Sequence, residues 1–321
     1  MGEFDLIDRF FKRPARRADL GVGDDCALLS PRPGHQLALS TDMLVEGRHF
    51  LSTADPVRLG HKCLAVNLSD LAACGAEPRA FLLSLALPRA DESWLGGFSQ
   101  GLFALADAHG CELIGGDTTQ GPLNISITVI GDVPRGLALL RSGAQKGDDI
   151  YVSGSLGDAR LALEAFRGHL SLPGSVFARC RERMERPLPR VALGMALRGI
   201  ASAAADISDG LLGDMGHILR QSGVGAQLHV DACENLLACR HEIDLPASWR
   251  RTCTLSGGDD YELVFTAPPS RRSAVEQAAQ ISQTPVTRIG TITQAPGVEL
   301  LDAQSQRVTT RFASFDHFAQ D

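Results

Sequence analysis

The stretch PVRLGHKCLAVNLSDLAACGA, residues 56–76, predicts a helix that is buried on almost every side. Pro56 favours the first turn of a helix, and Gly75 favours its end. Apolar residues occupy nearly every face between them, and Asn67 and Asp70 share one side with small residues. A carboxylate in such a helix costs several kcal/mol unless it is paired or bound to a metal. For Asp70 we therefore favour a metal ion.

Short apolar runs around this helix predict strands, and their alternation with helices favours a mixed α/β (α+β) fold. The expected strands cover residues 36–42, 81–88, 111–117, 124–133, 148–154, 261–267 and 286–293, and further helices are expected over 90–110, 156–168 and 208–223. A chain of 321 residues exceeds what one hydrophobic core usually serves. Pro, Gly and charged residues in 134–148 place a domain boundary near the start of that segment. We expect one domain over 1–137 and a second over 138–321.

Composition excludes several function classes. The net charge of −7 disfavours nucleic acid as a partner, and no apolar run approaches the roughly 18 residues of a membrane span. The first residues lack the apolar core of a secretory signal, and the eight cysteines show no zinc-ligand spacing. We therefore expect a cytoplasmic protein with buried, reduced cysteines. Lysine occurs only at 12, 62 and 146, and no GxxxxGK[ST] loop is present.

Aspartates recur after apolar runs and beside glycine. They stand in GDD (Asp24, Asp25), STD (Asp42), NLSD (Asp70), IGGD (Asp117), DISDG (Asp206, Asp209) and SGGDDYEL (Asp259, Asp260). Each alone could be a turn residue, the role we favour for Asp24, Asp132, Asp148 and Asp149. Together they indicate a site at strand ends. Carboxylates without His or Cys partners suit a hard cation, Mg²⁺ first.

A site with many acids and few lysines is typical of chemistry between two phosphorylated molecules. Two dianionic groups about 4 Å apart repel by several kcal/mol even at an effective dielectric constant near 20. Bridging Mg²⁺ ions remove that repulsion, and carboxylates hold the ions. The metal then supplies the positive charge that lysines would otherwise provide.

Eight collinear segments resemble the bacterial thiamine-monophosphate kinase family. They are GVGDDCALL, STDMLVEGRHF, KCLAVNLSDLAACGAEP, LIGGDTTQGP, RSGAQKGD, DISDGLLGDMGHI, SGGDDYELVF and the terminal FDHF. The resemblance as a whole runs from residue 2 to residue 318. This family belongs to the aminoimidazole-ribonucleotide-synthetase-like superfamily. The resemblance implies an N-terminal α/β domain that dimerises across a barrel-like sheet, followed by a C-terminal α/β domain. The expected assembly is a homodimer.

The resemblance also implies a reaction and its site. The reaction is ATP-dependent phosphorylation of thiamine monophosphate to thiamine diphosphate, with several Mg²⁺ ions. The implied metal ligands are Asp25, Ser40, Thr41, Asp42, Asp70, Asp117, Asp206 and Asp209. The implied ATP contacts are Gly116, Asp117, Arg141 and Ser208, and the implied substrate contacts are His49, Asp259 and Phe312. The family often has glutamate at the position of Asp259 and tryptophan at that of Phe312. Phenylalanine can still stack on a thiamine ring, with less area.

No general base is expected among these residues. The acceptor is a phosphate oxygen, and a phosphomonoester with a second pKa near 6 is already mostly ionised at neutral pH. We therefore expect direct in-line transfer of the γ-phosphoryl group, catalysed by positioning and charge neutralisation.

Several alternatives have distinct signatures. A selenophosphate-forming member of the superfamily needs a reactive N-terminal cysteine beside a lysine, which is absent, and another member could make a cyclised ribonucleotide. A two-metal phosphohydrolase generally adds histidines, and the nine here are not grouped with the acids. A non-catalytic protein would bind Mg-ATP without consuming it. Taken without the family, His49 is better explained as a hydrogen-bonded loop histidine than as a site residue.

Overall fold

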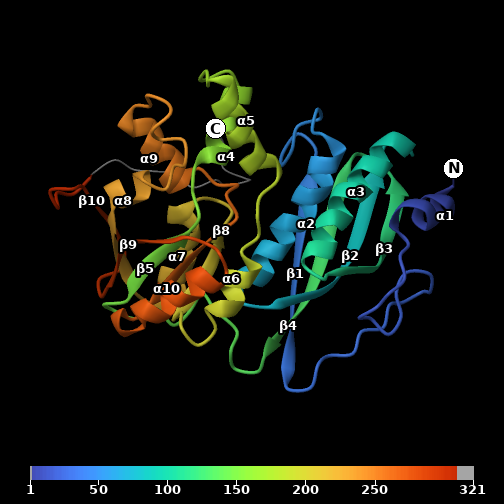
Figure 1. The fold of residues 1–321 in the computed structure, drawn as a ribbon, viewed down its shortest axis with the longest axis horizontal. Coiled ribbons are helices and arrows are strands. Elements are labelled where there is room, and N and C mark those ends of the chain that lie inside the picture. The colour runs from blue at the N-terminus through green and yellow to red at the C-terminus, as the bar shows by residue number, and fades with distance from the viewer. Residues whose placement is uncertain (1, 309–321) are drawn as a thin grey trace. The chain divides into compact units, whose positions relative to one another are not determined.

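The computed structural model describes residues 2–308 and divides the chain into two compact units (Figure 1). The first unit comprises Met1–Leu71 and Ala76–Gly136, and the second comprises Ala72–Gly75 and Leu137–Asp321. Both units combine a sheet with helices, so the expected mixed α/β class is confirmed. Phe312 and the FDHF segment lie outside the described residues.

The first unit contains a four-stranded sheet in the order β1-β4-β2-β3. Its elements are α1 (Glu3–Leu6), the π-helical turn η1 (Ile7–Phe11), β1 (His35–Val45), α2 (Pro56–Ala73), β2 (Glu77–Leu87), α3 (Glu92–Ala108), β3 (Glu112–Gln120) and β4 (Asn124–Pro134). Strand β4 pairs antiparallel with β1 and β2, and β2 pairs parallel with β3. Helix α2 confirms the helix predicted over 56–76. It ends three residues earlier, where Gly75 takes a left-handed φ of 66°.

Helices α2 and α3 cover one face of this sheet (Figure 1). Alternate residues of the strands point toward them and are buried, among them Phe81, Leu83 and Leu85 in β2 and Ile127 in β4. On the opposite face β1 exposes Leu37, Leu39 and Met43, with 40%, 62% and 54% of their surface accessible. The sheet therefore has one packed face and one apolar face that no described helix covers.

The second unit contains a six-stranded sheet in the order β10-β7-β9-β5-β8-β6. Its elements are β5 (Asp149–Ser153), α4 (Asp158–Phe166), α5 (Gly174–Glu185), α6 (Val191–Ala196), β6 (Ala203–Ile207), α7 (Leu211–Ser222), β7 (Gly225–His229), α8 (Val230–Glu234), α9 (Ala247–Ser256), β8 (Glu262–Ala267), the 3-10 turn η2 (Pro269–Arg271), α10 (Arg272–Ile281), β9 (Val286–Thr293) and β10 (Gly297–Leu301). Only β10 and β7 pair in parallel. The sequence predicted β5, α4, α7, β8 and β9. The elements that were not foreseen are α5, α6, α8, α9, α10, β6, β7 and β10.

Two aspartates expected in turns lie in strands instead. Asp132 is buried in β4, where it pairs with Arg79 and with Arg32. Asp149 begins β5 and pairs with Arg272 at 2.7 Å and with a second arginine at 3.1 Å. The turn prediction was wrong because arginines distant in the sequence neutralise these carboxylates, which allows them to be buried in a sheet.

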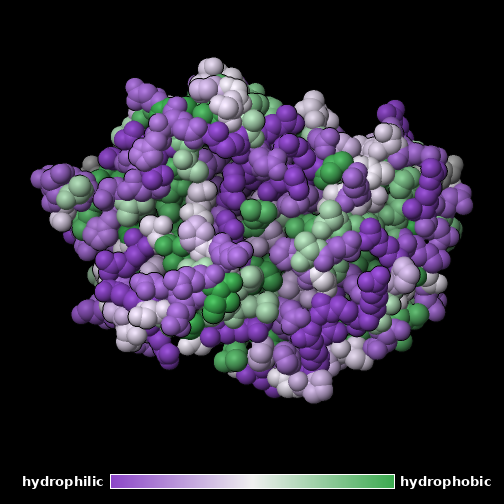
Figure 2. Space-filling view, in the orientation of Figure 1, coloured by the Kyte–Doolittle hydropathy of each residue, from purple (hydrophilic) through white to green (hydrophobic). Residues whose placement is uncertain are grey.

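The face of the molecule drawn in Figure 2 carries hydrophilic residues over most of its area. Hydrophobic residues appear there as small separate groups. In residues 2–308 no helix is both long enough and apolar enough to span a membrane.

Candidate functional site

Three predicted site residues of the first unit lie together between β1 and α2. The Ser40 hydroxyl donates a hydrogen bond to Oδ2 of Asp70. Asp42 lies two residues further along β1, so its side chain points to the same face. Its backbone N–H donates to Oδ1 of Asn67 at 3.0 Å, and the Asn67 amide donates to the Cys63 carbonyl at 2.9 Å. A strand and a buried helix thus hold a hydroxyl and two carboxylates side by side.

Asn67 was noted in the sequence only as a neighbour of Asp70 on the helix. Its side chain is completely buried. It accepts a hydrogen bond from the backbone N–H of Asp42, a predicted metal ligand in β1, which is an outermost strand of the sheet. A fully buried amide in an otherwise apolar helix was the sequence signal for this role, because such a group must find hydrogen-bond partners.

The sheet register separates two other predicted residues from this cluster. Thr41 lies between Ser40 and Asp42, so its side chain is on the opposite face, where its hydroxyl bonds that of Thr128. Asp117 is paired with Ser84 of β2, and Ser84 is paired through β4 with Met43 of β1. The side chains of these paired residues point to the same face of the sheet, which is the exposed one. Three strand spacings amount to about 14 Å. Within one chain the register therefore places Asp117 away from Asp42 and across the sheet.

Gly116 precedes Asp117 in β3 and has a φ of 147°. A Cβ there would stand 1.9 Å from the Leu83 carbonyl oxygen, so only glycine allows β3 to approach β2 so closely. Asp25 lies in an exposed loop before β1, where its N–H donates to Oδ1 of Asp24 at 2.8 Å.

His49 lies in a tight turn after β1. Its ring Nδ1 accepts a hydrogen bond from the Val45 N–H at 3.0 Å, and its backbone N–H donates to the Val45 carbonyl. In the neutral ring the proton therefore resides on Nε2. This tautomer presents an N–H donor, the group that a phosphate oxygen requires.

The predicted residues of the second unit gather where β6 ends and β8 begins. Asp206 is in β6, and Ser208 and Asp209 follow directly. The Asp259 N–H donates to the Ser208 carbonyl at 2.7 Å, and the Tyr261 N–H donates to the Ile207 carbonyl at 2.8 Å. Loops 207–210 and 257–261 are therefore joined backbone to backbone. Four predicted residues converge on this junction.

Two glycines make this close approach possible. A Cβ on Gly210 would lie 2.9 Å from backbone atoms of Ser256, and one on Gly258 would lie 2.8 Å from the Ser208 carbonyl oxygen. Both residues have left-handed φ values, 112° and 69°. In addition Asp259 and Tyr261 have φ values of 63° and 53°, a conformation that costs a non-glycine residue about 1 kcal/mol or more.

Buried carboxylates behind these loops hold the strained backbone in place. Glu262 is completely buried and binds Arg190 through two contacts of 2.6 Å, Arg183 at 2.7 Å and the Ser153 hydroxyl at 2.6 Å. Asp260 accepts the Gly157 N–H at 2.9 Å, and burial raises its pKa well above the usual value.

Buried and part-exposed residues thus alternate in the segment Asp259–Glu262. Asp260 and Glu262 are buried, and Asp259 and Tyr261 are part-exposed. Sequence analysis singled out Asp259 and missed the anchoring role of its neighbours. The alternation within GGDDYEL was the available signal.

Asp214 is a further residue that sequence analysis missed. Its Oδ2 accepts hydrogen bonds from the N–H groups of Ser208, Asp209 and Gly210 at 3.0, 3.0 and 3.1 Å. Burial, followed by the charge of Asp209, raises the pKa of Asp214 to about 7, although the three N–H donors act in the opposite direction.

Arg141 lies in the exposed segment before β5 and is close enough to α7 to influence His217. Burial lowers the pKa of His217, and the charges of Arg141 and Arg220 lower it further, while Asp209 raises it. Arg141 and Asp209 therefore both lie within electrostatic range of one imidazole. This places a cation near the predicted ATP contacts of the second unit.

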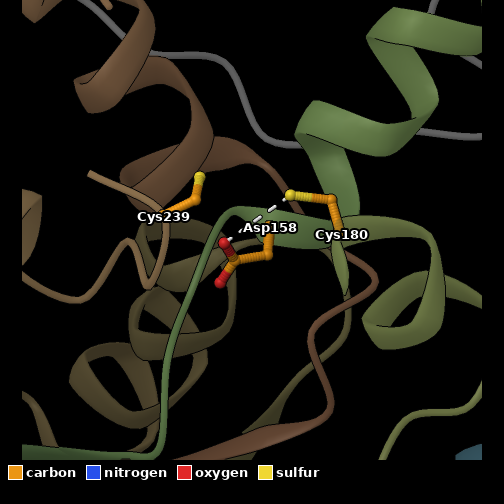
Figure 3. A group of neighbouring side chains, drawn as sticks. All are labelled: Asp158, Cys180 and Cys239. Carbon is orange, nitrogen blue, oxygen red and sulfur yellow. Dashed lines mark hydrogen bonds between the residues drawn. The ribbon is translucent and has the colours of Figure 1, made fainter. Parts of the chain in front are cut away.

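A different group of metal-ligand atoms was not predicted. Figure 3 shows Asp158, Cys180 and Cys239 converging from α4, α5 and the segment after α8. Their ligand atoms lie within 4.8 Å of one another. In the part of the chain that the structure describes, no three of the predicted carboxylates approach so closely. Sequence spacing could not show this group, because its members are 22 and 59 residues apart.

The chemistry of this group favours a packing role. The Cys180 thiol donates to Oδ1 of Asp158 at 3.9 Å, and the Ala238 N–H donates to Oδ2 at 3.3 Å. A hydrogen bond with Cys239, and then burial, raise the pKa of the Cys180 thiol, and burial raises that of Asp158. The Cys180 thiol and the Asp158 carboxyl group are hydrogen-bonded to each other, and within residues 2–308 no fourth ligand joins this group.

The two units match two family models. Residues 23–133 match the AIR synthase related protein N-terminal domain, and residues 145–303 match the corresponding C-terminal domain. Thiamine-monophosphate kinase of Salmonella typhimurium strain LT2 is 46% identical over 323 residues, which cover 99% of this chain and 98% of that protein.

Solved structures agree with these matches. The crystal structure of thiamine-monophosphate kinase from Stenotrophomonas maltophilia K279a has a TM-score of 0.83 and 47% identity, and the match covers 88% of this chain and 91% of that one. AaThiL complexed with AMPPCP and TMP has a TM-score of 0.75 and 30% identity over 90% and 89% of the two chains. The chain therefore belongs to the thiamine-monophosphate kinases, an enzyme family built from two AIR synthase related domains.

Proposed function

We propose that this enzyme transfers the γ-phosphoryl group of ATP to thiamine monophosphate, which yields thiamine diphosphate and ADP. The observation that carries the proposal is the match to thiamine-monophosphate kinases over nearly the whole chain. The AaThiL structure adds support, because it holds AMPPCP and TMP on a similar fold. The two acid clusters of this chain, at strand ends or beside a buried helix, further support the proposal.

The donor set of each cluster fits Mg²⁺. In the first unit Ser40, Asp42 and Asp70 offer only oxygen atoms. In the second unit Asp206 and Asp209 do the same, next to the Ser208 hydroxyl. Hard divalent cations prefer such ligands. When bound, several Mg²⁺ ions would neutralise the phosphate charges of both substrates. Asp25, Thr41 and Asp117 complete the proposed ligand set.

The chain's own residues bind and align the two phosphates. We assign ATP to Gly116, Asp117, Arg141 and Ser208, and thiamine monophosphate to His49 and Asp259, with Phe312 in the undescribed C-terminal segment. Nε2–H of His49 donates to a substrate phosphate oxygen. Asp259 is held by the Ser208 carbonyl, so the substrate contact and an ATP contact share one backbone junction.

The proposed step is an in-line displacement. A phosphate oxygen of thiamine monophosphate forms a bond to the γ-phosphorus of ATP, and the bond from that phosphorus to the β,γ-bridging oxygen breaks. No proton has to be removed, because the attacking oxygen is ionised at neutral pH. The residues therefore act by positioning and by electrostatics, and no side chain serves as a general base.

We further propose that the two domains divide these tasks and that two copies associate. Domain 1–137 would bind ATP and magnesium and form the dimer, and domain 138–321 would complete the nucleotide and substrate site. The exposed apolar face of β1, with Leu37, Leu39 and Met43, supports an interface there. Asp117 lies on that same face of the sheet, so the proposed association would place it at the interface.

The direct test is incubation with Mg-ATP and thiamine monophosphate, followed by chromatography. Thiamine diphosphate and ADP should form in equal amounts, and EDTA should abolish the reaction. Release of inorganic phosphate without thiamine diphosphate would indicate a phosphohydrolase, and binding of Mg-ATP without turnover would indicate a non-catalytic protein. A phosphorylated enzyme intermediate on the turnover path would contradict direct transfer.

A further inference from the structure

The start of α7 differs from an ordinary helix N-terminus in the direction of its donors. The first N–H groups of a helix have no partner within the helix, and they often bind phosphate. Here the N–H groups of Ser208, Asp209 and Gly210 all donate to one carboxylate oxygen of Asp214. Asp214 is only 4% exposed. These three donors are therefore directed into the protein and are occupied.

The carbonyl groups beside them are occupied as well. The Ile207 carbonyl accepts the Tyr261 N–H, and the Ser208 carbonyl accepts the Asp259 N–H. With these backbone donors and acceptors engaged, loop 207–210 also carries side-chain oxygen atoms. They belong to Ser208 and Asp209, which are partly exposed, next to Asp206 at the end of β6. Oxygen atoms favour a cation, whereas outward N–H groups would favour an anion.

We propose that Asp214 is a positioning residue that turns the N–H groups of the loop before α7 inward, so that this loop presents oxygen ligands to a cation. This inference rests on the proposed function, in which Asp206 and Asp209 hold Mg²⁺. Asp214 itself touches neither metal nor substrate. By holding three successive N–H groups on one side, it fixes the backbone from which Ser208 and Asp209 project.

An ordinary helix cap would not account for all the hydrogen bonds that Asp214 accepts. An acidic residue in the first turn commonly reaches back to one N–H. Asp214 accepts three, and all three belong to residues before α7, which begins at Leu211. The opposite side of the loop is fixed by the close approach of Gly210 to Ser256 and of Gly258 to Ser208. The loop is therefore restrained from both sides.

Three variants of the full-length enzyme test the proposal. Asp214→Asn keeps an oxygen in the same place, Asp214→Ala removes it, and Asp231→Ala removes an exposed acid from the first turn of α8 as a matched control. Mn²⁺ binding, followed by the electron paramagnetic resonance signal of the free ion, gives a readout that does not depend on turnover. Loss of a residue that orients metal ligands typically weakens metal affinity about tenfold to a hundredfold.

We expect Asp214→Ala to weaken Mn²⁺ binding about tenfold, with Asp214→Asn within about threefold of the wild type. Asp214→Ala should also become sensitive to inorganic sulfate, because its N–H groups can turn outward. A folded Asp214→Ala variant with wild-type Mn²⁺ affinity and no sulfate sensitivity would overturn the proposal. If Asp214→Ala does not fold, Asp214→Ser replaces it under the same criteria. Absent kinase activity in the wild type would instead refute the proposed function and leave the Mn²⁺ result to be judged separately.

Discussion

The two acid clusters are held in opposite ways. In the first unit Ser40, Asp42 and Asp70 project from a regular strand and a regular helix, and one buried amide joins the two elements. In the second unit Asp209 and Asp259 lie in loops with left-handed residues, next to Asp206 near the end of β6. Buried carboxylates at 214, 260 and 262 restrain those loops. Regular elements position acids through their own backbone, whereas irregular loops need a second layer of charged groups behind them.

The largest expected effect comes from removing charge in the cluster on regular elements. The double substitution Asp42→Asn, Asp70→Asn should lower the rate of thiamine diphosphate formation by at least about a hundredfold. Because β1 and α2 keep their backbone hydrogen bonds, the melting temperature should change little. Rates are compared with those of Asp8→Asn, an exposed acid of the same unit. Near wild-type turnover by the double variant would show that these acids hold no essential ion.

The second prediction concerns the anchors of the irregular loops. Glu262→Gln leaves the guanidinium groups of Arg183 and Arg190 buried without a counter-charge. Breaking a buried pair in this way costs about 3–5 kcal/mol, so urea denaturation should show a large loss of stability together with a loss of activity. Asp244→Asn, an exposed acid of the same unit, should leave both unchanged. A stable and active Glu262→Gln protein would contradict the claim that buried charged groups restrain the loops of the second cluster.

A third substitution distinguishes the role of the Asp259 carboxylate from that of the Asp259 backbone. Asparagine tolerates a left-handed φ as aspartate does, so Asp259→Asn should fold with wild-type stability. Losing a charged hydrogen-bond partner should raise the KM for thiamine monophosphate about tenfold, with little change in the KM for Mg-ATP. Equal changes in both constants would mean that the substitution disturbed the whole junction.

The smallest effect should come from a part-exposed carboxylate in the first unit. A hydrogen bond from Arg32, followed by one from Arg17, lowers the pKa of Glu77 from 4.5 to about 2. The folded state therefore gains stability from Glu77 above pH 4.5, and this gain is lost as the pH falls toward 2. Because the side chain is 33% exposed, the gain should be about 1 kcal/mol or less. Urea denaturation of Glu77→Gln and wild type should differ at pH 7 and converge near pH 2.

Much of the fold could be predicted because its elements have strong local patterns. Helix α2 has Pro56 and Gly75 at its ends, β4 alternates apolar with polar residues, and β8 contains the apolar run Leu263–Phe265. Helix α5 was missed because its apolar residues are few and interrupted by arginines, and α6 was missed because it has only 6 residues. Arginine and aspartate ion pairs also misled the analysis at Asp132 and Asp149, since partners more than fifty residues away leave no local signal.

The sequence by itself determined the α/β class, the chemical type of the site residues and the family. Acidic residues beside glycines and at strand ends mostly form turns or bind cations, so these residue types indicated the chemistry of the site. Tertiary structure alone decided which of them meet. Side chains on a strand alternate between two faces, so Asp42 joins Asp70 while Asp117 lies across the sheet. It also revealed Asp214, Asp260 and Glu262, because a buried carboxylate acquires its role from partners that only folding brings within hydrogen-bond distance.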